Sequence, residues 1–308
     1  MGFSVSLQQA KQRPEVSLFL GRQLVSASLA IVRLRTFVAL AVAFGSIGVS
    51  ASSSASNAPG PRAPIPRDPA ALARTLVDTK SNLQRAIDAW LGRRQPRPPD
   101  EVTLDALYDQ RIELLLAART GLARATLLRV PAEIAGEVRS NLTAKRELSR
   151  LTPVTHRKRF RTGPALPPAT LLRYYRAGQA RFGVRWNVLA AVNLVESAFN
   201  KLRNNSASGA QGPMQFIPAT WRAYGLGGDV HDPHDAILGA ANYLHANGAP
   251  GSYRRALLHY NQSPQYVTAI LRFAHRMRRD PRAFYAYYAW QVYVRTPTGV
   301  RRITGPDA

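Results

Sequence analysis

The chain of 308 residues contains no cysteine. Disulfide bonds, thiolate metal sites and cysteine nucleophiles are therefore excluded, as is lipid attachment through an N-terminal cysteine. The length is sufficient for one sizeable hydrophobic core and a smaller additional region.

Acidic residues are scarce, because 18 Asp and Glu stand against 42 Lys and Arg and leave a formal net charge of +24. Such a charge would suit a nucleic-acid-binding protein. The arginines are spread along most of the chain, however, and no recognition helix, zinc finger or RNA-binding sheet signature is present. We expect no nucleic-acid partner, and instead a basic surface that faces anionic cell-wall polymers or a membrane surface.

The N-terminal region carries the pattern of a secretory signal. Basic residues Arg33 and Arg35 precede an apolar run over 38–49, and small residues follow up to Ala55. The run is shorter than the ~20 residues that span a bilayer. We predict that 1–55 is an N-terminal extension with a signal for export to the secreted or cell-wall side. A membrane anchor is the alternative if the signal is not cleaved.

The remaining chain divides by composition. Ser, Ala, Pro and Gly dominate 56–67, which predicts a flexible linker. Apolar residues at helical spacing predict a helical region over 68–150, to which we assign a structural role. A basic, Pro-containing connector over 151–166 follows it. The tail over 295–308 continues an alternating pattern that begins near Gln291 and predicts a small β-hairpin. The helices of the helical region are marked by Leu72, Leu76, Leu83 and Ile87, by Leu104, Tyr108, Ile112 and Leu115, and by Ile134, Val138 and Leu142.

Glu196 is an isolated acid, because neither 148–195 nor 197–228 contains another carboxylate. Its spacing places it on one helical face with three apolar residues, Leu189, Val192 and Phe199. An apolar setting disfavours the ionised carboxylate and raises its pKa toward the range of a general acid. The alternative is a solvated charge near a helix end.

Two further segments carry polar groups suited to sugars. In the run from Gly209 to Trp221, glycines permit close backbone approach, and Gln215 offers two donors and an acceptor. Tyr260 and Asn261 end another apolar helix with a phenol and an amide. Taken singly, these segments are equally typical of an ordinary loop and an ordinary helix end.

Taken in order, the three segments resemble the soluble lytic transglycosylase domain, which has a lysozyme-like fold. The resemblance covers about 167–290, and we place the catalytic domain at 167–294. It implies an all-α fold and cleavage of the β-1,4 bond between N-acetylmuramic acid and N-acetylglucosamine in peptidoglycan. It also implies a catalytic acid at Glu196 and substrate-binding positions at Ser197, Met214, Gln215, Tyr260 and Asn261. We expect a monomer without cofactor or metal.

One departure concerns the branch of the family. The sequence motif over 212–229 resembles that of another lytic murein transglycosylase branch, whereas the short interval from Glu196 to Gly209 matches the soluble branch. The two branches share the reaction, so the departure leaves the predicted chemistry unchanged.

A single carboxylate is unusual for a glycosidase, since most use two. Glu196 would donate a proton to the glycosidic oxygen, and the N-acetyl group of the substrate would stabilise the developing cation. The carboxylate would then accept a proton from the C6 hydroxyl, which closes a 1,6-anhydro ring. Water in place of that hydroxyl would make the protein a lysozyme-type hydrolase. A non-catalytic protein that binds cell wall or polyanions is a third interpretation.

The segment from Asp229 to Asp235 contains three carboxylates and two histidines. It lacks the ligand pattern of an EF-hand. Asp232 followed by Pro233 favours a cap at the start of a helix over a metal site. A second catalytic carboxylate, Asp235, is an open alternative.

Overall fold

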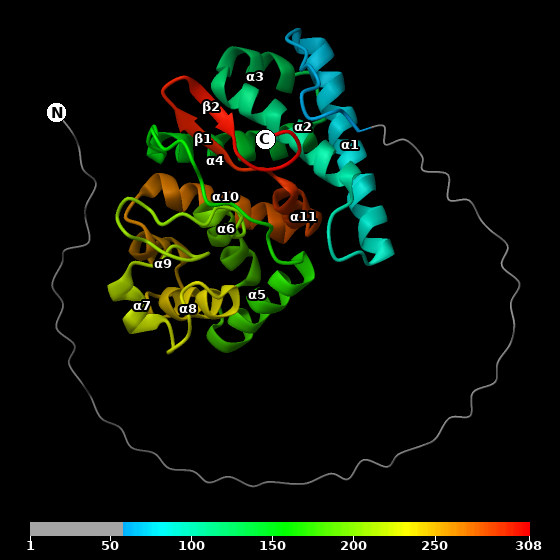
Figure 1. Ribbon diagram of the computed structural model, residues 1–308. Coiled ribbons are helices and arrows are strands. Elements are labelled where there is room, and N and C mark those ends of the chain that lie inside the picture. Colours follow the sequence, from blue (N-terminus) through cyan, green and yellow to red (C-terminus); the bar gives the residue numbers. More distant parts are fainter. Residues whose placement is uncertain (1–57) are drawn as a thin grey trace, which may run out of the picture. The chain divides into compact units, whose positions relative to one another are not determined.

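The computed structural model describes residues 58–308, and the fold described is that of this part of the chain (Figure 1). The predicted secretory signal and the first two residues of the predicted linker lie outside it. The described residues form eleven helices and one two-stranded antiparallel sheet, which confirms the predicted all-α fold. None of these helices has both the length and the apolar character needed to cross a membrane.

Four helices make up the N-terminal part of the described chain: α1 (Pro69–Arg93), α2 (Asp100–Ala118), α3 (Thr120–Leu127) and α4 (Ala132–Leu151). The carboxylate of Asp68 caps α1 by accepting hydrogen bonds from two backbone amides, and Pro69 occupies its first turn. The predicted helices correspond to α1, α2 and α4. Helix α3 was not predicted.

Seven helices and the sheet follow. Proline lies in the first turn of α5, α7, α8 and α10, where its missing N–H costs no intrahelical bond. Helix α6 contacts α5, α8, α10 and α11, so it lies at the centre of this part. The elements are α5 (Pro168–Phe182), α6 (Trp186–Ser197), α7 (Pro218–Tyr224), α8 (Pro233–Ala246), α9 (Tyr253–Tyr260), α10 (Pro264–Arg279), α11 (Arg282–Ala289), β1 (Tyr293–Thr296) and β2 (Gly299–Arg302).

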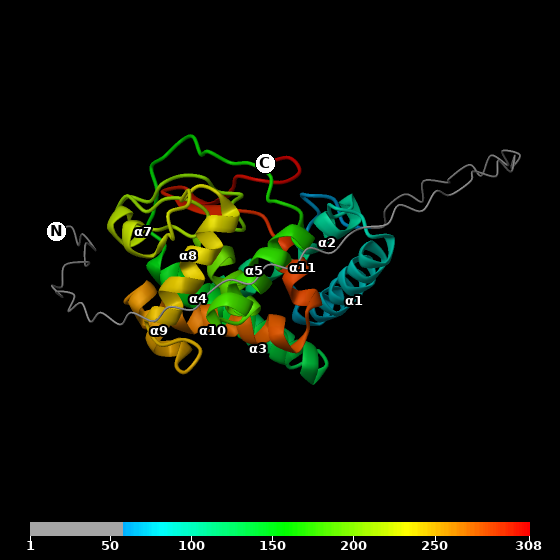
Figure 2. The same cartoon turned by 90° about the horizontal axis from the view of Figure 1, so that it is seen from below.

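A shared hydrophobic core joins the N-terminal helices to those around α6. Leu83, Ile87 and Trp90 of α1 belong to the same buried cluster as Leu189 of α6 and Phe273 of α10. Helix α4 also packs along α10, whereas α1 and α7 lie at opposite ends of the unit in both views (Figure 1 and Figure 2). Because the core is continuous, the division of the chain into a helical region and a catalytic domain stays a prediction.

A second, smaller core lies among the N-terminal helices. It contains Leu72, Ile112 and Val138, from α1, α2 and α4. Ile65 packs against this cluster, and the Tyr108 hydroxyl donates a 2.7 Å hydrogen bond to the Pro64 carbonyl. This packing differs from the flexible linker predicted over 56–67. Composition did not reveal it, because the segment is anchored by only two apolar residues, Ala63 and Ile65, and one backbone carbonyl.

The sheet is the predicted hairpin, with Val294 opposite Arg301 in its register. It begins at Tyr293, so it straddles the predicted end of the catalytic domain. The predicted connector over 151–166 is held beside it, since the Thr155 amide donates a 2.8 Å hydrogen bond to the Arg295 carbonyl. The connector is therefore attached to the hairpin at the C-terminal end of the chain.

A buried ion cluster links the N-terminal helices to α10. The Lys80 ammonium lies 3.0 Å from a carboxylate oxygen of each of Asp109, Glu113 and Glu137. Arg276 of α10 pairs with Glu137 in turn. Burial alone would lower the pKa of Lys80, but the three carboxylates hold that pKa well above its usual value. Lys145 also lies 3.5 Å from Glu113, so Lys80 is the cation that all three carboxylates share.

We expect Lys80→Met to destabilise the protein strongly, because it leaves the buried Asp109 carboxylate without an ion pair and removes one of the two cations at Glu113 and at Glu137. Loss of one partner from a buried ion cluster costs about 3–5 kcal/mol. Urea unfolding at pH 7 measures the change. The matched control is Arg150→Ala, which removes an ion pair whose Arg side chain is 65 % exposed and should change the free energy of unfolding by less than ~1 kcal/mol. Equal small losses in both variants would contradict a stabilising role for the cluster.

Candidate active site

Glu196 occupies the last turn of α6 and is half-buried. Leu189 and Val192, which precede it on the predicted face, are fully buried, so the carboxylate does lie at the edge of an apolar stripe. The prediction was wrong for Phe199, because α6 ends at Ser197 and Phe199 reaches the core from a turn. The helical spacing therefore applies to 189–196 alone.

The turn after α6 has an unusual backbone. Ala198, Phe199 and Asn200 have φ of 50°, 61° and 67°, although none of them is glycine. The left-handed conformation costs such residues roughly 1–2 kcal/mol each. Burial of the Phe199 ring and a 2.9 Å hydrogen bond from the Asn200 amide to the Ser197 hydroxyl offset part of this cost. The turn reverses the chain directly behind Glu196.

A chain of buried polar groups holds the end of α6 to the loop over 209–216. The Ser197 hydroxyl donates a 2.6 Å hydrogen bond to the Pro213 carbonyl, and the Asn193 amide donates to the same oxygen at 2.9 Å. The Tyr175 hydroxyl donates to the Asn193 side-chain oxygen at 2.7 Å. Ser197 is only 2 % exposed, so the structure places it beneath the site rather than at a sugar-binding surface.

The loop over 209–216 is a tight reversal closed by two backbone hydrogen bonds of 2.9 Å between Gln211 and Phe216. Gly212 has a φ of 71°, and a side chain there would overlap the carbonyl oxygen of Val230. Glycine is therefore required at this position for both conformation and space.

Two predicted binding residues of this loop differ in their surroundings. Met214 is fully buried, and its carbonyl accepts a 2.7 Å hydrogen bond from the Tyr260 hydroxyl. Its side chain thus belongs to the core, contrary to the predicted substrate contact. Gln215 is half-buried, and its amide donates to the Gly212 carbonyl at 2.9 Å, which leaves its side-chain oxygen available as an acceptor.

Among the described residues, Glu196 has one hydrogen-bond partner, Tyr266 of α10, whose hydroxyl donates to a carboxylate oxygen at 2.6 Å. Burial raises the pKa of Glu196 to about 7, while the hydrogen bond from Tyr266 acts in the opposite direction. No charged group among the described residues contributes to this shift. The pKa of Tyr266 lies well above its usual value because the ring is buried beside the carboxyl, so its hydroxyl stays a donor.

A row of tyrosine rings leads away from Glu196. The Tyr260 ring is parallel to that of Tyr266, with centroids 6.5 Å apart. Tyr243 meets Tyr260 edge to face at 5.6 Å, and Tyr224 meets Tyr243 at 4.8 Å. The outer three rings are half-buried and offer apolar surface. Aromatic surface next to an acid suits the faces of sugar rings.

Tyr266 binds Glu196 and stacks on Tyr260, whose hydroxyl in turn binds the Met214 carbonyl. Tyr266 itself was not predicted from the sequence. Tyr266 lies on the apolar face of α10 with Val267 and resembles a core residue in the sequence. No local pattern distinguished it. Asn261, which was predicted, is exposed directly after α9, and its side chain makes no hydrogen bond with the described residues.

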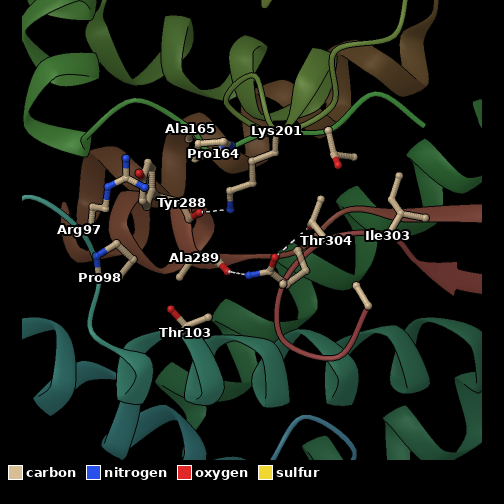
Figure 3. A pocket seen from close by; sticks show the side chains of 15 residues that line it. Arg97, Pro98, Thr103, Pro164, Ala165, Lys201, Tyr288, Ala289, Ile303 and Thr304 are labelled. Carbon is tan, nitrogen blue, oxygen red and sulfur yellow. Dashed lines mark hydrogen bonds between the residues drawn. The ribbon is translucent and has the colours of Figure 1, made fainter. Parts of the chain in front are cut away.

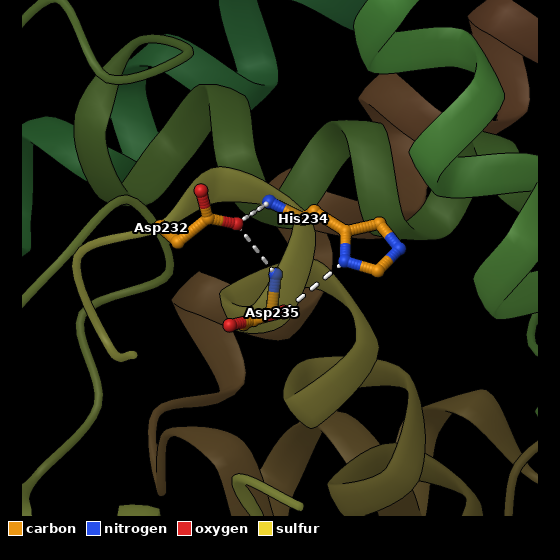
Figure 4. Close-up of side chains that lie close together, drawn as sticks. All are labelled: Asp232, His234 and Asp235. Atoms are coloured by element: carbon orange, nitrogen blue, oxygen red, sulfur yellow. Dashed lines mark hydrogen bonds and ion pairs between the residues drawn. The ribbon is translucent and has the colours of Figure 1, made fainter. Parts of the chain in front are cut away.

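The segment before α8 contains Asp232, His234 and Asp235, whose possible ligand atoms lie within 4.8 Å of one another (Figure 4). Asp232 accepts hydrogen bonds from the amides of His234 and Asp235 at 2.8 and 3.1 Å, which confirms the predicted cap. The Asp229 amide donates to Asp235 and lowers the pKa of that carboxyl. Asp235 is therefore ionised at neutral pH and engaged in local structure.

Residues 173–276 match the family model of the transglycosylase SLT domain. The matched range contains Glu196, the loop over 209–216, Tyr260, Asn261 and Tyr266. No curated protein and no solved structure matched the chain. The match confirms the predicted resemblance and its lysozyme-like superfamily.

We expect Tyr266→Phe to raise the pKa of Glu196 above about 7, because the variant keeps the burial and removes the hydrogen bond that favours the carboxylate. Titration of the ¹³C-labelled glutamate carboxyl by NMR measures it. Tyr243→Phe is the matched control, since Tyr243 donates to the His259 carbonyl and not to Glu196. An unchanged or lower Glu196 pKa in Tyr266→Phe would refute the assignment of this hydrogen bond.

Proposed function

We propose that this chain, a carrier of the transglycosylase SLT domain, is an exported peptidoglycan lytic transglycosylase. It cleaves the β-1,4 bond between N-acetylmuramic acid and N-acetylglucosamine and leaves 1,6-anhydro-muramic ends. The domain supports a peptidoglycan-degrading activity of this type. The observation that carries the finer proposal is the half-buried Glu196 with a pKa of about 7.

In the first step Glu196 acts as a general acid. At a pKa of about 7 a substantial fraction of the carboxyl is protonated at neutral pH, and it loses its proton readily when the leaving oxygen gains charge. The proton passes to the glycosidic oxygen as the bond from C1 of muramic acid breaks. The N-acetyl group of the substrate stabilises the positive charge that develops at C1.

In the second step the same residue acts as the base. The Glu196 carboxylate accepts the proton of the C6 hydroxyl, whose oxygen bonds to C1 and closes the anhydro ring. The proton count balances, because the residue ends as it began and water is neither consumed nor released. The Tyr266 hydroxyl remains a hydrogen-bond donor in both steps and holds the carboxyl in place.

A one-carboxylate mechanism agrees with the electrostatics of the site. Among the described residues, no second acid contributes to the pKa of Glu196. Asp235, the alternative second carboxylate, is held by the Asp229 amide and His234. The hydrolase, in which water replaces the C6 hydroxyl, uses the same acid and is distinguished by its product.

The surroundings of Glu196 supply the remaining requirements of the proposal. The rings of Tyr260 and Tyr243 offer stacking surfaces to pyranose rings, and Gln215 and Asn261 offer hydrogen bonds to hydroxyl and acetamido groups. We place peptidoglycan strands against these groups, and Ser197 and Met214 behind them as supports. Action on a cell-wall substrate suits export, and we propose that the protein acts as a monomer.

Digestion of purified peptidoglycan tests the proposal. Glu196→Gln should lose about 10²–10⁴-fold in rate, the range that removal of a general acid–base costs. Asp235→Asn is the control and should retain most activity. Mass analysis of the wild-type products should show anhydro-muramic ends. Reducing muramic ends would establish the hydrolase instead, and absence of cleavage would establish a non-catalytic protein.

The pH dependence follows from the same pKa. Because the protonated form of Glu196 starts the reaction, kcat/KM should be constant below pH ~6 and fall about tenfold per unit above pH 7. In Tyr266→Phe this alkaline limb should move to higher pH, while the rate falls roughly tenfold through lost positioning. A lower rate with an unshifted limb would reduce Tyr266 to a purely structural role.

A further inference from the structure

A cavity of about 520 Å³ lies where several segments far apart in the sequence meet (Figure 3). Arg97 enters from the loop after α1, Thr103 from α2, Lys201 from the turn after α6, and Thr304 from the C-terminal segment. Glu196, Gln215 and Tyr260 do not line it. The cavity is thus separate from the proposed glycan site, although Lys201 is only five residues from Glu196.

A second cavity of about 580 Å³ adjoins the first. The two share Thr162, Ile303 and Ala308 among their lining residues. Phe160 of the connector and Arg301 of β2 line the second one. We call the two together the paired cavities. Each has the volume of a small-molecule site.

The charge of the lining is strongly positive. Five cationic side chains line the paired cavities, whereas Asp307 is the single acidic side chain in the described lining. The side chains of Arg97 and Lys158 have no hydrogen bond or ion pair with any residue that the structure describes. The cations are Arg97, Lys158, Lys201, Arg301 and Arg302.

Lys201 is half-buried, as is Arg302, whereas the other three cations are exposed. Its ammonium donates hydrogen bonds to the carbonyls of Tyr288 and Trp290, and burial lowers its pKa to about 7. No carboxylate among the described residues pairs with it. An anion bound in the cavity would favour the charged form of Lys201. It would supply the negative partner that no described carboxylate provides.

Apolar groups accompany the charges. Phe160 lies beneath the Arg301 guanidinium at 5.7 Å, and Val300 beside it is 62 % exposed. Such a lining suits a chain that alternates charged groups with carbon backbone.

We propose that the paired cavities bind a linear polyanion whose phosphate or carboxylate groups are spaced along a flexible chain. The charges of Arg97 and Lys201 hold one anionic group, and those of Lys158 and Arg301 hold another. This site is independent of glycan cleavage and would keep the protein at an anionic polymer of its surroundings.

Binding of inorganic polyphosphate and of polygalacturonate, each at 150 mM salt, tests the proposal on the whole protein. We expect the triple variant Arg97→Ala, Lys158→Ala, Arg301→Ala to bind at least tenfold more weakly than wild type. The matched control is Arg74→Ala, Arg124→Ala, Arg139→Ala. It removes the same charge from exposed helix positions whose side chains make no hydrogen bond or ion pair with the described residues, and it should bind within twofold of wild type.

Arg301 also contacts the connector, so its replacement would disturb the fold as well as the charge. A second variant therefore leaves Arg301 in place. The double variant Arg97→Glu, Lys158→Glu alters two unpaired side chains and should lose binding while retaining the wild-type Tm. Binding of polyphosphate alone would identify phosphate as the ligand group, and binding of polygalacturonate alone would identify carboxylate; either outcome supports the site.

Equal weakening in the cavity triple and the control triple would overturn the proposal, because net charge alone would then explain binding. So would binding to phosphatidylglycerol vesicles with no binding to either polymer. The measurement is repeated with Glu196→Gln, in which polymer binding should be unchanged. The polyanion site and the catalytic proposal can therefore fail separately.

Discussion

The hydrogen bond from Tyr266 to Glu196 is the interaction on which the proposed chemistry depends. It joins the end of α6 to the beginning of α10, two helices separated by about 70 residues of chain. Burial raises the pKa of the Glu196 carboxyl and the hydrogen bond from Tyr266 lowers it, and the two effects together set this pKa at about 7. The position of α10 relative to α6 consequently determines the proton affinity of the site.

That position is supported from outside the matched domain. Helix α4 packs along α10, and Glu137 of α4 pairs with Arg276 near the far end of α10. Lys80 connects Glu137 to α1 and α2. The N-terminal helices thus have a structural role that no catalytic motif in their sequence indicates. They restrain the helix that carries Tyr266, which lies within the region matched by the family model.

The sequence predicted the helices with long apolar periods, the hairpin, the Asp232 cap and the isolated acid at Glu196. It failed where three-dimensional packing replaces local pattern. Ser197 and Met214 carry the right residue types at the family positions, yet the structure buries both, and their polar atoms bind the loop and Tyr260. Tyr266 went unnoticed because its partner is distant in sequence and its neighbours on α10 are apolar.

The turn over 198–200 connects two groups that burial moves toward the same pKa from opposite sides. The carboxyl of Glu196 and the ammonium of Lys201 both reach a pKa of about 7, the first raised and the second lowered. Neither pairs with the other, because three left-handed residues turn the chain between them and direct the two groups to different spaces. The turn thus separates the carboxyl of Glu196 from the cationic cavity that Lys201 lines.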